Sequence, residues 1–314
     1  MTPDPTPMVV VAALTKAFEG VTVVDQVAFN VEKGEIFGVV GPDGCGKTTI
    51  LRMLASVMAA NGGSIKIGGI DGRAEPERIK PHLSYMPQRF GLYEDLTVAE
   101  NIQFYADIFE VPKALQQERS EKLLAASGMN RFRGFLAGQL SGGMKQKLGL
   151  TCALVHTPEL LLLDEPTTGV DPLSRREFWD ILYDLRETGV TIIISTAYLD
   201  EAERCNRLAL LHKGKLLYCD TPDALKQRMP GDLLAISSTD GRAARSVIAS
   251  APGVSRTLLV GDGLHVVVDN ASLRISQLQN ALDGAGVPVS GIAQIKPAIE
   301  DVFVSLLDSG EQNA

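Results

Sequence analysis

The sequence is poor in aromatic residues, cysteine and histidine, and it has no long apolar run. Among its 314 residues there are one Trp, four Cys and four His. No cysteine forms a C-x-x-C pair or lies near a histidine at metal-ligand spacing, so we expect reduced thiols rather than a disulfide framework or a zinc site. No stretch approaches the roughly 18 consecutive apolar residues that span a bilayer. The Pro-rich start, Met1 to Met8, lacks the features of a signal peptide, so we expect a partner to bring the chain to any membrane where it works.

Positive charge is also in deficit. The 30 Lys and Arg residues against 38 Asp and Glu residues give a formal net charge of −8. This balance provides no electrostatic footprint for nucleic acid, so we expect no nucleic-acid partner. Hydrophobic residues at 45% and charged residues at 22% are ordinary for a folded protein, and the length predicts one large domain or two moderate ones.

A glycine-rich loop lies between a predicted strand and a predicted helix. Ile36 to Val40 is a short apolar run, and helical spacing of apolar residues extends from Lys47 to Met58. Between them, GPDGCGKT at Gly41 to Thr48 fits G-x-x-x-x-G-K-[ST], the phosphate-binding loop. We expect Lys47 to reach the β- and γ-phosphates and Thr48 to be a Mg²⁺ ligand. The alternative, a chance match on a glycine turn, is disfavoured by the strand and helix on either side.

Two further segments carry candidate chemistry. The apolar strand Leu160 to Leu163 ends in Asp164 and Glu165, and the carboxyl ends of parallel strands line the ligand crevice of an α/β sheet. Asp164 would hold the Mg²⁺ shell and Glu165 would act as general base. Ser141, followed by two glycines, is a good N-cap for a helix whose free N–H groups can face an anion. Taken by itself, this third segment is more simply an ordinary helix cap.

Together these three segments resemble the ATP-binding subunit of an ABC transporter, over about residues 9–221. The resemblance implies an α/β fold, the ABC-type nucleotide-binding domain of P-loop NTPases, with a helical subdomain at about 92–158. The Pro-Gly break at Met229 to Gly231 is the expected boundary, so we expect this domain to span 1–231. The resemblance also implies ATP and Mg²⁺ as cofactors, and a head-to-tail dimer. In that dimer the signature serine and glycines complete the site of a second ATP-binding subunit, identical or a paralogue.

The resemblance assigns roles to particular residues. Gln88 resembles the loop residue that senses Mg²⁺ and the permease, and Asp171 lies in a loop like the family's dimer contact. Phe18 falls where the family stacks an aromatic ring on adenine, with a plain core Phe as the alternative. The expected catalytic residues are Glu165, Lys47 and Gln88; the metal ligands are Thr48, Gln88 and Asp164; the nucleotide-binding residues are Phe18, Gly41, Pro42, Asp43, Gly44, Cys45, Gly46, Lys47, Thr48, Thr49, Ser141, Gly142, Gly143 and Asp171.

One position departs from the family pattern. After the strand Thr191 to Ser195, the family places a histidine that contacts the γ-phosphate, and this chain has Ala197 there. A methyl group donates no hydrogen bond, and loss of one positioned donor commonly slows turnover by about 10²- to 10³-fold. The chain is therefore expected to be a slow half of an asymmetric pair, or else a homodimer in which Glu165 suffices. A milder departure is Met144, where the signature usually has glutamine.

The residues after Gly231 form a different pattern. Strands and helices alternate as β-α-β-β-α-β, which predicts a small ferredoxin-like α+β domain at 232–314, without clustered acid or base residues. We expect it to serve packing or dimer stability more than ligand sensing.

The segment YMPQRFGLYEDLTVAEN, Tyr85 to Asn101, resembles drug exporters whose permeases are separate type 2 membrane proteins. The resemblance is nearest to the first half of tandem two-ATPase exporter subunits. It implies a cytoplasmic, peripheral ATPase at the inner or plasma membrane, bound to permease subunits. The alternatives are a regulatory subunit that clamps ATP without turnover, and a soluble ABC ATPase of translation or DNA repair. The cargo and the direction of transport are left open.

Overall fold

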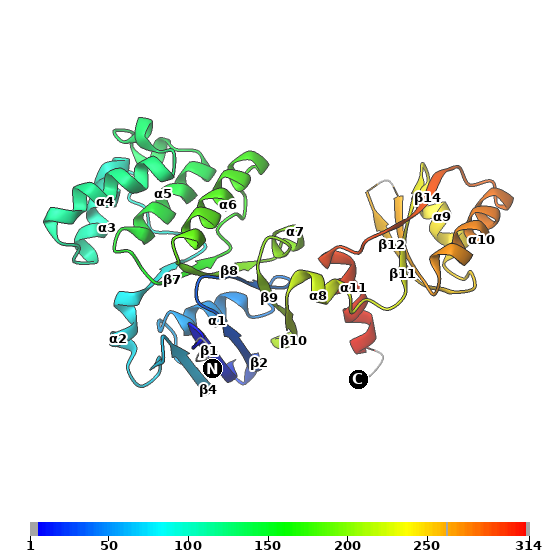
Figure 1. Cartoon of the computed structure of the whole chain (residues 1–314), viewed down its shortest axis with the longest axis horizontal. Coiled ribbons are helices and arrows are strands. Elements are labelled where there is room, and N and C mark those ends of the chain that lie inside the picture. Colours follow the sequence, from blue (N-terminus) through cyan, green and yellow to red (C-terminus); the bar gives the residue numbers. More distant parts are fainter. Residues whose placement is uncertain (1–5, 262, 312–314) are drawn as a thin grey trace, which may run out of the picture. The chain divides into compact units, whose positions relative to one another are not determined.

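The computed structural model in Figure 1 describes residues 6–261 and 263–311. The chain divides into two compact units, Met1–Pro222 and Asp223–Ala314. Within the described part of the chain, no helix combines the length and the hydropathy needed to cross a membrane. The four cysteines are free thiols, as expected from their spacing.

A parallel sheet forms the centre of the first unit. In the described residues its strand order is β10-β9-β3-β8-β7-β6, and β10 alone runs antiparallel to its neighbour. The strands are β3 (Ile36–Val40), β6 (Leu83–Met86), β7 (Leu160–Asp164), β8 (Thr191–Thr196), β9 (Arg207–His212) and β10 (Lys215–Asp220). A second, antiparallel sheet contains β2 (Val21–Val31), β1 (Val9–Phe18), β4 (Gly62–Ile67) and β5 (Ile70–Asp71), in that order.

Strand β7 shows why the central sheet is built from wholly apolar runs. Leu160 and Leu162 face one hydrophobic core, shared with α1 and the antiparallel sheet, whereas Leu161 and Leu163 face another core on the opposite side. A strand buried on both faces needs apolar residues at every position, not at alternate ones. The run LLLL therefore fixes β7 in the sheet and delivers Asp164 and Glu165 to the sheet's edge.

Helices cover the sheet and form the insert. They are α1 (Lys47–Leu54), α2 (Pro76–Ile79), α3 (Val98–Ile108), α4 (Lys113–Ala126), α5 (Gly142–Leu154), α6 (Pro172–Glu187) and α7 (Leu199–Ala202), with short 3₁₀ turns at Lys80–His82, Asn130–Phe132 and Ala137–Gln139. In Figure 1, α3, α4 and α5 lie together as the helical subdomain that the sequence predicts. Their shared core includes Val98, Ile102, Leu124 and Leu148.

The predicted end of the first helix is wrong. Apolar spacing predicts a helix to Met58, but α1 ends at Leu54. Ser56 adopts a left-handed conformation, φ 56°, which stops the helix, and Val57 is 62% exposed. Periodicity alone does not detect this stop, because the residues after it are still apolar.

The second unit has the β-α-β-β-α-β order predicted from the sequence. Its antiparallel sheet, in the order β12-β13-β11-β14, is that of a ferredoxin-like fold. After α8 (Pro222–Lys226), the elements are β11 (Asp232–Ser238), α9 (Gly241–Ile248), β12 (Val254–Val260), β13 (Gly263–Val268), α10 (Ala271–Gly284), β14 (Val289–Ile295) and α11 (Ile299–Glu311). The core side chains include Leu234, Ile236, Val266 and Leu278.

Candidate functional site

Three parallel strands bring the predicted site residues to one edge of the central sheet. Val40 at the end of β3 lies opposite Thr196 at the end of β8, and Asp164 at the end of β7 lies opposite Ser195. The segments that leave these strands are therefore neighbours, although they are far apart in the sequence. This edge is the usual ligand crevice of an α/β sheet.

The glycine loop is tightly packed against its surroundings. A Cβ added at Gly41 would lie 2.7 Å from Cys45 Sγ and closer still to the Leu211 carbonyl oxygen. Gly46 has φ 105° and would place a Cβ 2.8 Å from the Val23 oxygen. The loop conformation thus excludes larger residues at both positions. Gly46 is the N-cap of α1, so the first N–H groups of α1 are offered at the loop, where an anion is favoured.

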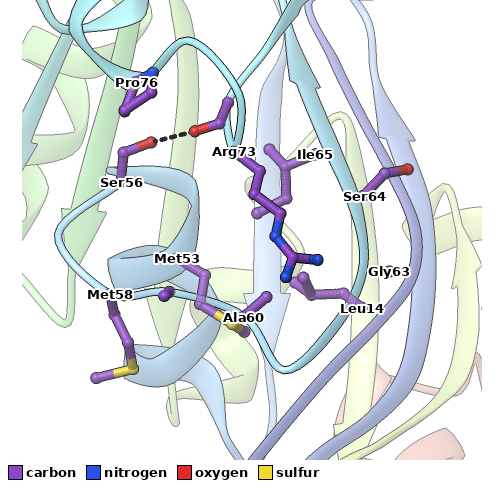
Figure 2. A pocket seen from close by; sticks show the side chains of 12 residues that line it. Leu14, Met53, Ser56, Met58, Ala60, Gly63, Ser64, Ile65, Arg73 and Pro76 are labelled. Carbon is purple, nitrogen blue, oxygen red and sulfur yellow. Dashed lines mark hydrogen bonds between the residues drawn. The ribbon is translucent and has the colours of Figure 1, made fainter.

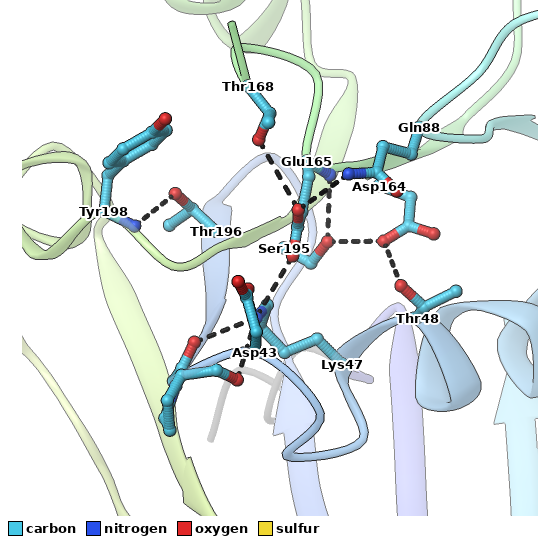
Figure 3. Close-up of polar contacts among 12 residues, drawn as sticks. Asp43, Lys47, Thr48, Gln88, Asp164, Glu165, Thr168, Ser195, Thr196 and Tyr198 are labelled. Atoms are coloured by element: carbon cyan, nitrogen blue, oxygen red, sulfur yellow. Dashed lines mark hydrogen bonds and ion pairs between the residues drawn. The ribbon is translucent and has the colours of Figure 1, made fainter.

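Lys47 lies inside the loop rather than extended into solvent, and it is 4% exposed. Its ammonium donates to the Gly41 oxygen at 2.9 Å and to the Pro42 oxygen at 3.1 Å. It also pairs with the Glu165 carboxylate at 3.1 Å, while the exposed Asp43 is more distant at 3.7 Å. The loop carbonyls therefore hold the Lys47 charge beside Glu165, as Figure 3 shows.

Glu165 is held by several partners in an unusual backbone conformation. Its φ of 47° is left-handed, which is rare for a residue other than glycine and persists only where the surroundings enforce it. Its N–H donates to Ser195 Oγ at 3.0 Å. Its carboxylate accepts from Gln88 Nε2 at 3.1 Å and from the Thr168 hydroxyl at 3.4 Å (Figure 3). The predicted catalytic residues Lys47, Gln88 and Glu165 are thus brought together.

Asp164 forms the second half of the site. Its Oδ1 accepts from Thr48 Oγ1 at 2.9 Å and from Ser195 Oγ at 2.8 Å, and its Oδ2 accepts from the Tyr85 hydroxyl at 3.1 Å. Burial, together with the nearby Asp164 carboxylate, raises the pKa of Tyr85 to about 12, so this hydroxyl keeps its proton and donates.

The oxygens of Thr48 and Asp164 fit a Mg²⁺ ion. Mg²⁺ prefers hard oxygen ligands and is commonly held by one or two carboxylates together with substrate phosphates. Within the described residues no group of three or more His, Cys, Asp and Glu could hold a metal on its own. The protein would therefore supply only part of the coordination shell, with Gln88 near the adjoining Glu165.

The signature segment is built by close contact between two helices. Ser141 caps α5 by accepting from the Met144 N–H at 3.3 Å. Asp171 caps α6 through the Leu173 and Ser174 N–H groups at 3.1 and 2.9 Å. A Cβ added at Gly143 would lie 2.6 Å from Ser174 Oγ, so the glycine is what allows α5 to approach α6.

Ser141 and Asp171 lie apart from the group formed by Lys47, Glu165 and Asp164. Among the described residues, no hydrogen bond or ion pair joins Ser141 or Asp171 to Lys47 or Asp164. Phe18 ends β1 with a ring that is 43% exposed, which excludes the core alternative and leaves adenine stacking as a prediction. Ala197 is exposed directly after β8, where the family pattern has histidine.

Sequence reasoning missed Ser195 and Tyr85 as site residues. Both are polar residues at or near the carboxyl end of a buried parallel strand, and that position was a usable signal. The contacts of Thr168 arise from a loop conformation that spacing does not reveal.

The comparisons with known proteins agree with this geometry. The ABC transporter family model matches residues 24–168. The chain is 34% identical to the daunorubicin/doxorubicin resistance ATP-binding protein DrrA of Streptomyces peucetius, over 77% of this chain and 74% of that protein. The chain belongs to the family of ABC transporter ATP-binding proteins. The expected resemblance and fold class are thereby confirmed.

Two further matches show how much of a relative's length this ABC protein spans. It is 42% identical to the probable multidrug ABC transporter ATP-binding protein YbhF of Escherichia coli (strain K12), over 88% of this chain and 48% of that protein. The match therefore spans about half the length of YbhF. A solved ATP-binding subunit of an ABC transporter superposes with a TM-score of 0.64 at 29% identity, over 70% of this chain and 92% of that one.

Proposed function

We propose that this chain binds and hydrolyses Mg-ATP as the motor subunit of an ABC exporter. One observation carries the proposal: the Glu165 carboxylate lies between Lys47 of the glycine loop and Gln88, beside the Thr48–Asp164 pair. These are the groups that phosphoryl transfer to water requires, namely an anion cradle, a general base and oxygen ligands for a metal ion.

Each group has a defined task in this proposal. The loop N–H groups and Lys47 bind the phosphates, because a helix N-terminus and an ammonium both favour negative charge. Glu165 accepts the proton of the attacking water, and Gln88 and Thr168 fix the direction of its carboxylate. A Mg²⁺ ion, when bound at Thr48 and Asp164, would neutralise charge on the phosphate oxygens.

The partners are inferred from the relatives and the signature segment. DrrA is described as a drug-resistance protein and YbhF as a probable multidrug transporter protein. We propose a type 2 exporter permease, contacted around Gln88 to Asn101, and a second ATP-binding subunit whose site Ser141, Gly142 and Gly143 complete. Phe18 and Asp171 would contact adenine and the dimer partner. The chain would thus lie at the cytoplasmic face of the inner or plasma membrane.

Ala197 supports a second candidate function. The exposed methyl group lies next to Thr196, whose carbonyl accepts from the Gly41 N–H at 3.3 Å, so it adjoins the phosphate loop. A methyl group supplies no donor to the γ-phosphate. In this alternative the chain clamps ATP as the regulatory half of an asymmetric pair, with little turnover of its own.

The test is Mg²⁺-dependent ATP turnover of the purified chain, with binding of a fluorescent ATP analogue measured in parallel. Lys47→Ala is the blank, and Lys33→Ala, an exposed lysine before the other end of β3, is the matched control. Turnover in the chain and in Lys33→Ala but not in Lys47→Ala supports the motor. Binding without turnover supports the clamp, and absence of binding contradicts both functions.

A further inference from the structure

Glu201 is a buried carboxylate in α7, four residues after Ala197, and its side chain has no solvent exposure. Both of its oxygens are used. Oε1 accepts from the Thr167 hydroxyl at 2.6 Å, and Oε2 accepts from the Thr196 hydroxyl at 2.8 Å. Arg175 Nε lies 3.7 Å from Oε1 and, although buried, makes no hydrogen bond.

Thr167 lies in the loop that leaves β7, and Thr196 is the last residue of β8, directly before the loop that contains Ala197. Thr167 is two residues after Glu165, and Thr168, its neighbour, donates to the Glu165 carboxylate. Thr196 directly precedes Ala197 and also accepts from the Tyr198 N–H at 2.9 Å (Figure 3). One carboxylate therefore joins the loop after Glu165, the proposed general base, to the segment that contains Ala197, where the family pattern has histidine.

The Arg175 side chain extends the same network to the start of α6. Its guanidinium stacks on the Tyr198 ring, 4.4 Å from the centroid, and its Nη1 is 3.7 Å from Asp200. Arg175 follows the Asp171 cap by one turn of helix. The network thus reaches the loop proposed to contact the dimer partner.

We infer that Glu201 is a positioning residue for hydrolysis, which holds the Glu165 loop and the Ala197 loop in fixed relation. The inference rests on the proposed function. Glu165 keeps a left-handed conformation that needs support from its surroundings, and its loop is tied down at Thr167 by Glu201. Because small displacements of a catalytic group strongly slow turnover, loss of this tie lowers kcat without weakening ATP binding.

The test removes the hydroxyl of each threonine while keeping the shape of the side chain. Thr167→Val and Thr196→Val each break one hydrogen bond to Glu201, and Thr167→Ser keeps the hydroxyl. Thr191→Val is the matched control: this threonine is equally buried, at the opposite end of β8, and its hydroxyl accepts from the Gly34 N–H at 3.0 Å. The readouts are kcat, KM for ATP, and amide hydrogen exchange at Thr168 and Val170, whose N–H groups close the loop.

We expect Thr167→Val and Thr196→Val to lower kcat about tenfold with little change in KM, and to speed exchange at Thr168 and Val170. In Thr196→Val, exchange at Tyr198 should speed too, because its N–H loses the Thr196 hydroxyl as acceptor. Thr167→Ser and Thr191→Val should keep the native kcat. Equal kcat and equal exchange in native protein and Thr167→Val would overturn the inference. The inference would also be overturned if amide exchange became faster throughout the first unit and Thr191→Val lowered kcat by the same factor, because that result indicates general destabilisation. If the native chain has no turnover, the proposed motor function fails, and exchange at the Thr168 and Val170 amides still decides whether Glu201 holds the Glu165 loop in place.

Discussion

The adjacent glycines of the signature segment give a sharp steric prediction. Gly142 and Gly143 both lie in the first turn of α5, and neither has a positive φ, so backbone strain does not distinguish them. A Cβ at Gly142 meets nothing within 4 Å, whereas one at Gly143 would lie 2.6 Å from Ser174 Oγ and closer to Ser174 Cβ. Alanine at the two positions should therefore have opposite effects on stability.

The magnitudes follow from the two surroundings. Gly142→Ala gains helix propensity and should stabilise the first unit by up to about 1 kcal/mol. Gly143→Ala must push α5 away from α6, and forced overpacking costs about 1–3 kcal/mol. The Val170 side chain, 3.4 Å from the added Cβ, leaves little space for a sideways shift.

A single tryptophan provides the assay. Trp179 lies on α6, is fully buried, and is the only tryptophan in the chain. Urea unfolding followed by Trp179 fluorescence therefore reports on the first unit, and the free energies of unfolding of the two variants can be compared directly. The expected difference between the variants is about 1–4 kcal/mol.

A rescue experiment checks the cause. Ser174→Gly removes the atoms that clash, so in a double-mutant cycle it should recover most of the loss caused by Gly143→Ala. The reasoning is refuted if Gly142→Ala destabilises as much as Gly143→Ala, or if the cycle shows no coupling between positions 143 and 174.

Three other variants test separate features. If the absence of histidine at position 197 limits the chemical step, Ala197→His should raise kcat by about 10²-fold or more with little change in KM, measured by steady-state ATP turnover. An unchanged kcat would contradict this explanation. Hydrogen bonds from Arg274 lower the pKa of Asp269 to about 2, so the ionised pair stabilises the second unit above the unfolded pKa near 3.8, and this stabilisation is lost as the pH falls through about 2. Arg274→Gln should therefore raise the Asp269 pKa toward 3.8 in a carboxyl NMR titration. An unchanged Asp269 pKa would count against the pairing. Leu162→Ala, at a fully buried β7 position, should lower the free energy of urea unfolding by about 2–5 kcal/mol; a loss below about 1 kcal/mol would show that the core refills the cavity.

The parts of the site that depend on local pattern are predictable from the sequence. The glycine loop is a contiguous motif, and the pairing of Thr48 with Asp164 follows from the rule that parallel strands end at one edge. The β-α-β-β-α-β order of the second unit was predictable because each strand and helix has a clear period.

The remaining parts depend on tertiary contacts that leave no period in the sequence. The end of α1 is set by the left-handed Ser56, and apolar residues continue past it. Glu201 reads as one acidic residue among several in LDEAE, and only the fold places it beneath Thr167 and Thr196. A buried carboxylate between two loops has no sequence spacing to reveal it.

The arrangement around Glu165 bears on how to interpret the missing histidine. Among the described residues, Glu165 is contacted by the side chains of Lys47, Gln88, Ser195 and Thr168. Position 197 is not among them, so alanine there leaves the contacts of the proposed general base intact. The expected defect is therefore confined to the chemical step, and ATP affinity should be preserved. The motor and the clamp are thus distinguished by kcat and not by ATP affinity. A chain that binds ATP normally but hydrolyses it slowly fits the clamp, as one half of an asymmetric pair. A homodimeric motor must both bind and hydrolyse ATP.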